Sequence, residues 1–228
     1  MKKVIAHRGL SSRFPENTLI SFKEALKTKA FAVECDVHLS KDQIPMVIHD
    51  EELSRTTPGV GKVGSYTYDE LKAFKVPSLK EVLELVVNGS QKYLLIEIKT
   101  HQEDMDYRKQ VGPIVYETVM KVIPKKRNRV ILISFDEFIL KTIRQLDKKI
   151  KLAPIFFQLP KDGSMAEHAK TLQSNMVIFS KKLLTKKKVF HMATQVKHFV
   201  YTALPSEFQK LSKIKSLTGF ATDYADRV

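Results

Sequence analysis

The sequence predicts an α/β fold, a (β/α)8 barrel of the TIM type with a small insertion after the second strand. The first observation is that short apolar runs of strand length alternate with segments of helical period along the chain. The second is that no Gly-rich phosphate loop marks the competing doubly wound open sheet. A chain of 228 residues suits one such barrel, so we expect a single domain over residues 1–228.

The number of strand-like runs is one more than an eight-stranded barrel needs. They cover residues 3–6, 32–37, 45–48, 93–98, 130–134, 151–156, 176–179, 197–202 and 219–222. The run 45–48 is the extra one, because only residues 39–44 separate it from the run before it. A parallel neighbour needs a crossover of a dozen or more residues. We therefore expect this run to return antiparallel, with a turn near Asp42-Gln43.

Helix signals fall between most of these runs. Asn17 is a candidate N-cap for a first helix that places Leu19, Phe22, Ala25 and Leu26 on one face. Capping boxes are predicted at Thr67 with Glu70 and at Ser78 with Glu81. Further helices fit residues 107–123, 138–146, 165–172, 187–194 and 207–214.

The stretch 51–76 contains turn signals and only one short helical segment. Pro58-Gly59 and Gly61 are residues typical of turns. We therefore expect this stretch to form a small insertion and not a domain.

Composition excludes several classes of protein. Hydrophobic residues make up 43% of the chain, as in ordinary globular proteins, and no apolar run approaches the roughly 20 residues that span a bilayer. The N-terminus runs at once into a strand, which leaves no room for a signal peptide, so we expect a cytoplasmic protein. The one cysteine, Cys35, rules out an internal disulfide and agrees with a reducing compartment.

The net charge of +14, from 39 basic and 25 acidic residues, suits a nucleic acid, an anionic membrane or a small anionic substrate. However, the basic runs are spread along the chain without interleaved aromatic residues, as on solvated helix ends. We expect no nucleic-acid partner, and membrane contact is permitted but not required. A closed barrel needs no partner, so a monomer and a homodimer are equally compatible.

Carboxylates occur at the ends of two predicted neighbouring strands. Residues i and i+2 of a strand share a face, so Glu34 and Asp36 point the same way, as do Glu97 and Lys99. Apolar residues surround both pairs, and an unpaired carboxylate there would be costly. Hard oxygen ligands of this kind suit Ca²⁺ or Mg²⁺. The three carboxylates Glu34, Asp36 and Glu97 are therefore candidate metal ligands, with Lys99 facing a phosphate.

Two histidines end strand-like runs. His7 ends the first and His49 ends the hairpin arm, and two imidazoles can serve as base and acid on opposite sides of a phosphorus atom. The guanidinium of Arg8 can bind two phosphate oxygens at once. Cys35 points to the opposite side from its acidic neighbours, so we expect it to pack in the core. We assign structural roles to His38, His101, His168, His191 and His198.

These motifs, in this order, resemble the glycerophosphodiester phosphodiesterase family. They are His7-Arg8-Gly9, Pro15-Glu16-Asn17-Thr18, Glu34-Cys35-Asp36-Val37, His49-Asp50 and Glu97-Ile98-Lys99. Weaker matches extend the resemblance across nearly the whole chain. They are Arg55-Thr56-Thr57 with Gly61, Pro77-Ser78-Leu79, Ser134-Phe135 and Thr222-Asp223.

The resemblance implies metal-dependent hydrolysis of a small glycerophosphodiester to glycerol 3-phosphate and an alcohol. In that family the glycerol hydroxyl of the diester is thought to attack phosphorus, and water then opens the cyclic phosphate. His7 and His49 match the general acid/base residues. The metal ligands match Glu34, Asp36 and Glu97, and the phosphate contacts match Arg8 and Lys99.

The chain departs from the family pattern mainly near its C-terminus. Tyr201-Thr202-Ala203-Leu204 stands where members often have Trp-Thr followed by Val-Asn, at the pocket wall that would meet the leaving alcohol. Three alternatives stay open. One is a phospholipase C or a phospholipase D of the sphingomyelinase kind, the second is a lysophospholipase D, and the third is a non-catalytic barrel that binds anions.

Overall fold

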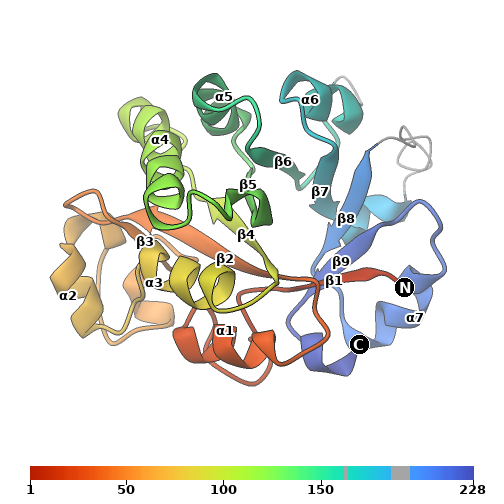
Figure 1. The fold of residues 1–228 in the computed structure, drawn as a ribbon, viewed down its shortest axis with the longest axis horizontal. Helices are drawn as coiled ribbons and strands as arrows, with labels where there is room; N and C mark the ends of the chain where they lie inside the picture. Colours follow the sequence, from red (N-terminus) through yellow and green to blue (C-terminus); the bar gives the residue numbers. More distant parts are fainter. Residues whose placement is uncertain (162–163, 186–195) are drawn as a thin grey trace.

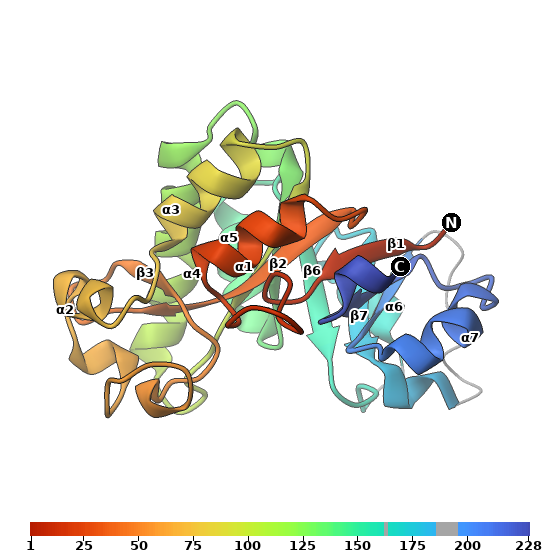
Figure 2. The same cartoon turned by 90° about the horizontal axis from the view of Figure 1, so that it is seen from below.

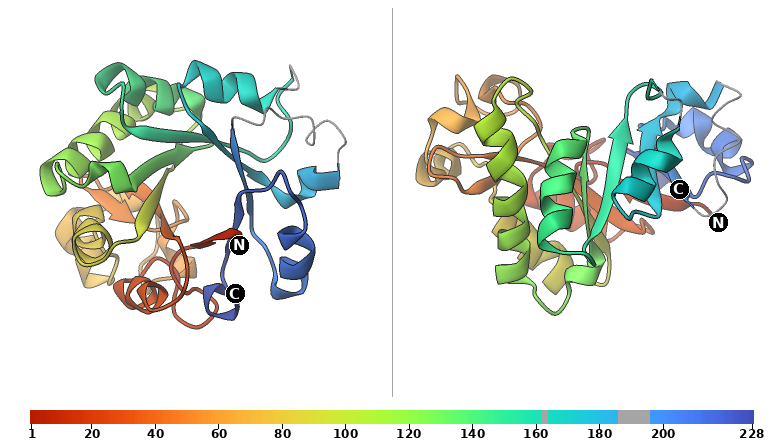
Figure 3. Two further views of the ribbon diagram at one scale, coloured as in Figure 1. Left: turned by 45° about the vertical axis from the view of Figure 1, so that its right-hand side comes forward. Right: turned by 90° about the horizontal axis from the view of Figure 1, so that it is seen from above.

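Eight parallel strands close into a barrel in the computed structural model, which describes residues 1–161, 164–185 and 196–228 (Figure 1). The ring runs β1, β9, β8, β7, β6, β5, β4, β2, and a β1–β2 pairing closes it. The strands are β1 (Lys3–Ala6), β2 (Ala32–Leu39), β4 (Tyr93–Ile98), β5 (Val130–Ser134), β6 (Lys151–Phe156), β7 (Met176–Ser180), β8 (Lys197–Tyr201) and β9 (Gly219–Thr222). The predicted barrel is confirmed, and the left view of Figure 3 shows helices around the ring of strands.

The ninth strand, β3 (Pro45–Val47), lies outside the barrel. It pairs antiparallel with β2, with Val47 opposite Val37, as the short connection predicts. Gln43 has a φ of 62°, and the Ser40 N–H donates to the Ile44 carbonyl at 3.0 Å, which closes the tight turn at the expected place. The hairpin therefore leads the chain from the carboxyl end of β2 back along that strand to Asp36, whose carbonyl accepts from the Ile48 N–H at 3.0 Å.

Helices cover the outside of the barrel and bury the outward-facing strand residues. They are α1 (Leu19–Leu26), α3 (Leu79–Leu83), α4 (Met105–Val122), α5 (Glu137–Leu146), α6 (Met165–Thr171) and α7 (Phe208–Ser212), whereas α2 (Tyr68–Ala73) packs within the stretch 51–76. Alternation along each strand splits the core in two. Val33 and Cys35 of β2 pack outward with helix residues such as Phe22. Leu95 and Ile133 point into the barrel with the other inward residues.

The start of the first helix differs from the prediction. Thr18, not Asn17, is the N-cap, and its side chain accepts from the Ser21 N–H at 3.3 Å. Asn17 has a left-handed backbone with a φ of 57°, whereas an N-cap is normally extended. Its buried amide instead donates to Asp36 Oδ2 at 2.8 Å. The prediction was wrong because Asn17 binds a strand across the fold and not its own helix.

Residues 51–76 pack around a small core of their own. Leu53, Val63 and Leu71 are fully buried there against the hairpin strand residue Met46. Short 3-10 helices at Leu53–Arg55 and Val63–Ser65 precede α2. Figure 2 shows α2 and α7 at opposite ends of the molecule.

The other helices agree with the predicted ones to within a few residues at each end. The helix expected at residues 187–194 lies outside the described residues. Within the described ranges, no helix has both the length and the apolar character that a membrane crossing requires.

Candidate active site

Three carboxylates meet inside the barrel near the carboxyl ends of β2 and β4. The parallel register sets Asp36 directly opposite Glu97. Glu34 lies two residues earlier in β2, on the same face of the strand. One oxygen atom from each of these residues lies within 4.8 Å of the others. Glu34 and Asp36 are buried, and Glu34 Oε1 has no hydrogen-bond partner among the described residues. Because hard divalent cations prefer carboxylate oxygens, these three residues could hold one.

Burial and mutual repulsion give the carboxylates different proton affinities. Burial, and then the charge of Asp36, raises the pKa of Glu34 to about 8. Burial also acts to raise the pKa of Asp36, but the charges of Lys99 and Arg8 outweigh it and hold that pKa below its usual range. The chain thus keeps Asp36 ionised and disfavours the charged form of Glu34.

Lys99 is the cation nearest to the carboxylates. Its Nζ lies 2.7 Å from Asp36 Oδ1 and also contacts Glu97. Burial lowers the pKa of Lys99, but the charges of Asp36 and Glu97 more than compensate and raise it to about 12. Lys99 therefore stays charged, and it lines the same cavity as Glu34 and Glu97.

Arg8 reaches the carboxylates through both its backbone and its side chain. Its backbone is left-handed, with a φ of 54°, and its N–H donates to Glu34 Oε2 at 2.9 Å. The guanidinium Nε lies 3.1 Å from Asp36 Oδ2, and Nη1 donates to Glu16 Oε1 at 3.0 Å. Strained backbones of this kind cluster at functional sites. The turn after β1 therefore places Arg8 over the carboxylates.

Each of the two predicted histidines has a carboxylate at Nδ1. His7 Nδ1 lies 2.7 Å from Asp223 Oδ1, and His49 Nδ1 lies 2.6 Å from Asp50 Oδ1. Both rings line the cavity, and Nε2 of neither ring has a hydrogen-bond partner in the described part of the chain. A carboxylate at Nδ1 fixes the tautomer and leaves Nε2 to exchange protons.

Electrostatics favour the protonated form of His7. Burial lowers its pKa, but the hydrogen bond with Asp223 and the charge of Glu34 more than offset that effect, so the pKa lies above its ordinary value. A histidine with a raised pKa holds a proton closer to neutral pH, as a general acid requires.

The cavity encloses about 220 Å³ and has two unlike sides. Its polar lining residues include both histidines, Arg8, Lys99, Glu34 and Glu97, and Asp36 lies behind them. The rest of the lining is mostly apolar and is formed by Ile5, Leu95, Ile133, Phe135, Ile155, Ile178, Tyr201, Thr202 and Ala221. Tyr201 and Thr202 line this wall, as expected, whereas Ala203 and Leu204 are not among the lining residues.

The geometry agrees with a comparison against protein families. The model of the glycerophosphoryl diester phosphodiesterase family matches residues 7–227, which include all seven predicted site residues. The chain belongs to this family.

Individual relatives of the family extend this result. A glycerophosphodiester phosphodiesterase of Bacillus altitudinis is 39% identical over 168 residues, which are 67% of this chain and 66% of that protein. A Thermotoga maritima glycerophosphodiester phosphodiesterase has a TM-score of 0.81 at 28% identity, over 99% of this chain and 96% of that one. An Oleispira antarctica phosphodiesterase in complex with the product sn-glycerol-3-phosphate has a TM-score of 0.85 at 25% identity, over 99% of this chain and 94% of that one.

The sequence assigned no individual role to Asp50, Arg55 and Glu16, three residues that support His49 and Arg8. Arg55 contacts Asp50 through Nε and donates from Nη2 to Glu16 Oε1 at 2.7 Å. Because Glu16 also accepts from Arg8, one chain of charged contacts joins His49 to Arg8. These residues lie within the quoted motifs, but the motifs do not reveal pairing across 39 positions.

The remaining described histidines lie outside the lining of the cavity. One of them, His38, contacts a catalytic candidate, because its Nε2 lies 3.0 Å from the His49 carbonyl oxygen. Burial lowers the pKa of His38 to about 4, so it is neutral and donates to that carbonyl. His191, for which we predicted a structural role, lies outside the described residues.

Proposed function

We propose that this chain is a glycerophosphodiester phosphodiesterase that hydrolyses its substrate, with a bound divalent cation, to glycerol 3-phosphate and an alcohol. In this proposal Glu34, Asp36 and Glu97 hold Ca²⁺ or Mg²⁺. The observation that carries it is that these carboxylates lie together beside a cavity that two carboxylate-paired histidines line. Family membership adds independent support.

Two imidazoles would divide the proton transfers that a diester requires. One takes the proton of the attacking hydroxyl, and the other gives a proton to the departing alkoxide. His7 has the raised pKa and suits the donor role, which leaves His49 as the acceptor. Hydrolysis of the resulting cyclic phosphate reverses the roles.

The phosphate would lie between the cations and the carboxylates. Arg8 and Lys99 are proposed to bind its oxygens, in exchange for the contacts that they now make with Asp36. A bound divalent cation supplies Lewis acidity, which stabilises charge on a phosphoryl oxygen. The relative from Oleispira antarctica, which is in complex with the product sn-glycerol-3-phosphate, supports glycerol 3-phosphate as the product.

A lysophospholipid is the second candidate substrate, and the apolar wall of the cavity favours it. Phe135 lines the cavity with a residue exposure of 45% and packs edge-on against Tyr201, with ring centroids 6.0 Å apart. Exposed apolar side chains at the mouth of a cavity mark ligand-binding grooves. An acyl chain could cover them, whereas a small alcohol could not.

The first experiment is to measure release of the free alcohol, choline or ethanolamine, from glycerophosphocholine, glycerophosphoethanolamine and lysophosphatidylcholine, with Ca²⁺, Mg²⁺ or chelator. The site variant is Glu34→Gln with Asp36→Asn. Its matched control is Glu84→Gln with Asp69→Asn, which makes the same changes at exposed positions. We expect metal-dependent release that the site variant loses and the control keeps.

Other outcomes would contradict parts of the proposal. Undiminished release with chelator would exclude the divalent cation. Release from lysophosphatidylcholine alone would show that the substrate is a lysophospholipid and not a small glycerophosphodiester. Binding of glycerol 3-phosphate without turnover of any of the three substrates would favour the non-catalytic barrel.

A further inference from the structure

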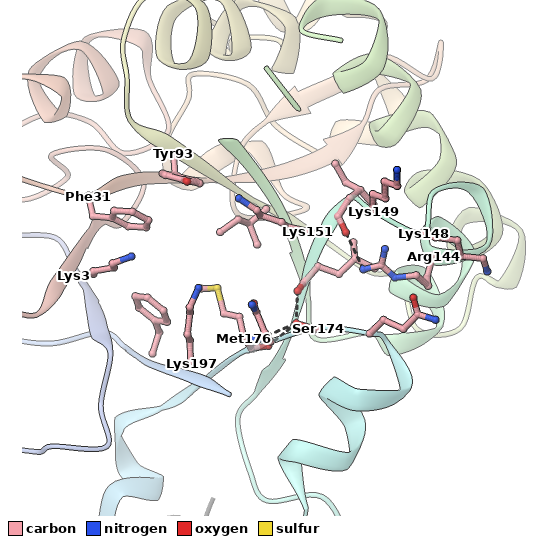
Figure 4. A pocket seen from close by; sticks show the side chains of 16 residues that line it. Lys3, Phe31, Tyr93, Arg144, Lys148, Lys149, Lys151, Ser174, Met176 and Lys197 are labelled. Atoms are coloured by element: carbon pink, nitrogen blue, oxygen red, sulfur yellow. Dashed lines mark hydrogen bonds between the residues drawn. The ribbon is translucent and has the colours of Figure 1, made fainter. Parts of the chain in front are cut away.

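A second cavity, of about 370 Å³, occupies the opposite mouth of the barrel, at the amino ends of the strands (Figure 4). Lys3, Lys151 and Lys197 line it, and each is the first residue of its strand. By alternation they share the inward face of the barrel with residues two positions later, such as Ile5 and Phe199. Figure 4 shows their amino groups directed toward the middle of the cavity.

Among the described residues, no carboxylate lines this cavity. Lys3, Lys151 and Lys197 form no ion pair with any acidic residue of the described ranges. Lys148 and Lys149 add two more positive charges at its rim. A hollow lined by charges of one sign concentrates counter-ions in solution.

Aromatic rings hold two of the lysines without cancelling their charge. Phe31 and Tyr93 stack with ring centroids 4.7 Å apart. Lys3 Nζ lies 4.2 Å from the Phe31 centroid, and Lys151 Nζ lies 4.8 Å from the Tyr93 centroid. These cation–π contacts hold the amino groups without using their N–H donors. Lys151 donates one N–H to the Asn128 carbonyl oxygen, and its remaining donors can meet another partner.

The wall beside the lysines is built from rigid, buried groups. Arg144 is buried, and its guanidinium donates at 2.8 Å to each of the carbonyl oxygens of Leu172, Asp147 and Ile150. Ile131, Met176 and Phe199 are also buried and line the inner end of the cavity. The inner wall of the cavity is therefore preformed, and the exposed lysines stand at its mouth.

We propose that the amino-end mouth of the barrel binds a small phosphate-bearing anion with at least two negative charges. Three inward ammonium groups repel one another, and a multiply charged anion between them relieves that repulsion through charge-assisted hydrogen bonds. The groups line a hollow inside the barrel mouth, which suits a small molecule better than a flat membrane surface. This site lies at the other end of the barrel from the carboxylates.

Calorimetric titration with inorganic pyrophosphate tests the proposal. Chelator is present throughout, so that pyrophosphate carries no metal ion to the carboxylates. The test variant combines Lys3→Gln, Lys151→Gln and Lys197→Gln. The matched control combines Lys23→Gln, Lys29→Gln and Lys125→Gln, which removes the same net charge from exposed positions outside both cavities.

We expect the test variant to bind pyrophosphate at least about tenfold more weakly than the unaltered chain, and the control within about threefold. Glycerophosphodiester turnover should be unchanged in both. If the triple variant loses its far-UV circular dichroism signal, Lys197→Gln alone provides the comparison, with an expected loss of about threefold.

Three results would overturn the proposal. Equal weakening in both triple variants would show that only net charge matters. Loss of binding in Lys99→Gln, with binding kept in the test variant, would place pyrophosphate at the carboxylate end. Sedimentation of the chain with phosphatidylglycerol vesicles, without pyrophosphate binding, would assign the lysines to a membrane surface.

Discussion

Asp223 and His7, which are 216 positions apart, are joined by a 2.7 Å contact between Oδ1 and Nδ1. They meet because β1 and β9 are adjacent parallel strands in which Ala6 lies opposite Thr222, so the residue after each strand faces the other. Asp223 also accepts from Ser11 Oγ at 3.0 Å, which fixes the carboxylate. Asp223 therefore holds the imidazole in one tautomer and favours its protonated form.

Asp223→Asn should reduce kcat/KM by at least about tenfold, because it removes part of the acid/base contribution of His7. The limb of the pH profile that reports His7 should move to lower pH, because Asp223 raises that pKa. The measurement is kcat/KM against pH. Asp226→Asn, which affects only a contact with exposed Arg13, serves as control. A profile that superimposes on the original would contradict this role.

Lys99→Met should lower the stability of the metal-free chain by about 3 kcal/mol, because it leaves buried Asp36 with one fewer cation. Added Ca²⁺ should restore part of the loss, because a cation bound by the carboxylates replaces the missing charge. Thermal unfolding with and without Ca²⁺ measures both effects. Lys72→Met, which breaks a more exposed pair with Glu81, should cost less than about 1 kcal/mol and show no added Ca²⁺ response. Equal behaviour of the two variants would exclude this role of Lys99.

Gly9→Ala should destabilise the chain far more than Gly61→Ala. Both glycines have a left-handed backbone, with φ of 85° and 91°, so each alanine adds strain of about 1–2 kcal/mol. A Cβ at Gly9 would also lie 2.3 Å from Ser21 Oγ and 2.7 Å from the Ser21 carbonyl carbon, whereas the nearest atom at Gly61 is 3.9 Å away. We expect an additional loss of about 2 kcal/mol at Gly9. Urea unfolding of the two variants provides the comparison, and losses of the same size would refute it.

His198→Asn should make stability less sensitive to acid. Burial lowers the pKa of His198, whose Nδ1 donates to the Ser216 carbonyl at 3.3 Å. Below about pH 6.5 the unfolded chain takes up a proton that the folded chain resists, so stability is full above that pH and falls as the pH falls. One such group accounts for a slope of up to about 1.4 kcal/mol per pH unit. Urea unfolding between pH 4 and 7 should give a shallower slope for the variant, and parallel curves would rule out this contribution.

Strand periodicity made much of the fold predictable from sequence. The barrel follows from alternating strand-like and helical segments, and the antiparallel hairpin follows from the short connection before β3. The convergence of Glu34, Asp36 and Glu97 follows from the two-residue repeat and from the adjacency of β2 and β4. These features depend on the period of the backbone and on the lengths of the connections between strands.

Contacts between distant segments were decided by the tertiary structure. Asn17 binds Asp36 instead of capping its helix, and Arg55 of the insertion reaches Glu16. The inward lysines of β1, β6 and β8 are far apart in the chain and meet only because the sheet closes into a ring. Sequence alone determined which face of each strand a side chain occupies, since that depends on the period of the backbone. Ring closure and register determined which side chains meet, because these depend on the packing of the whole chain.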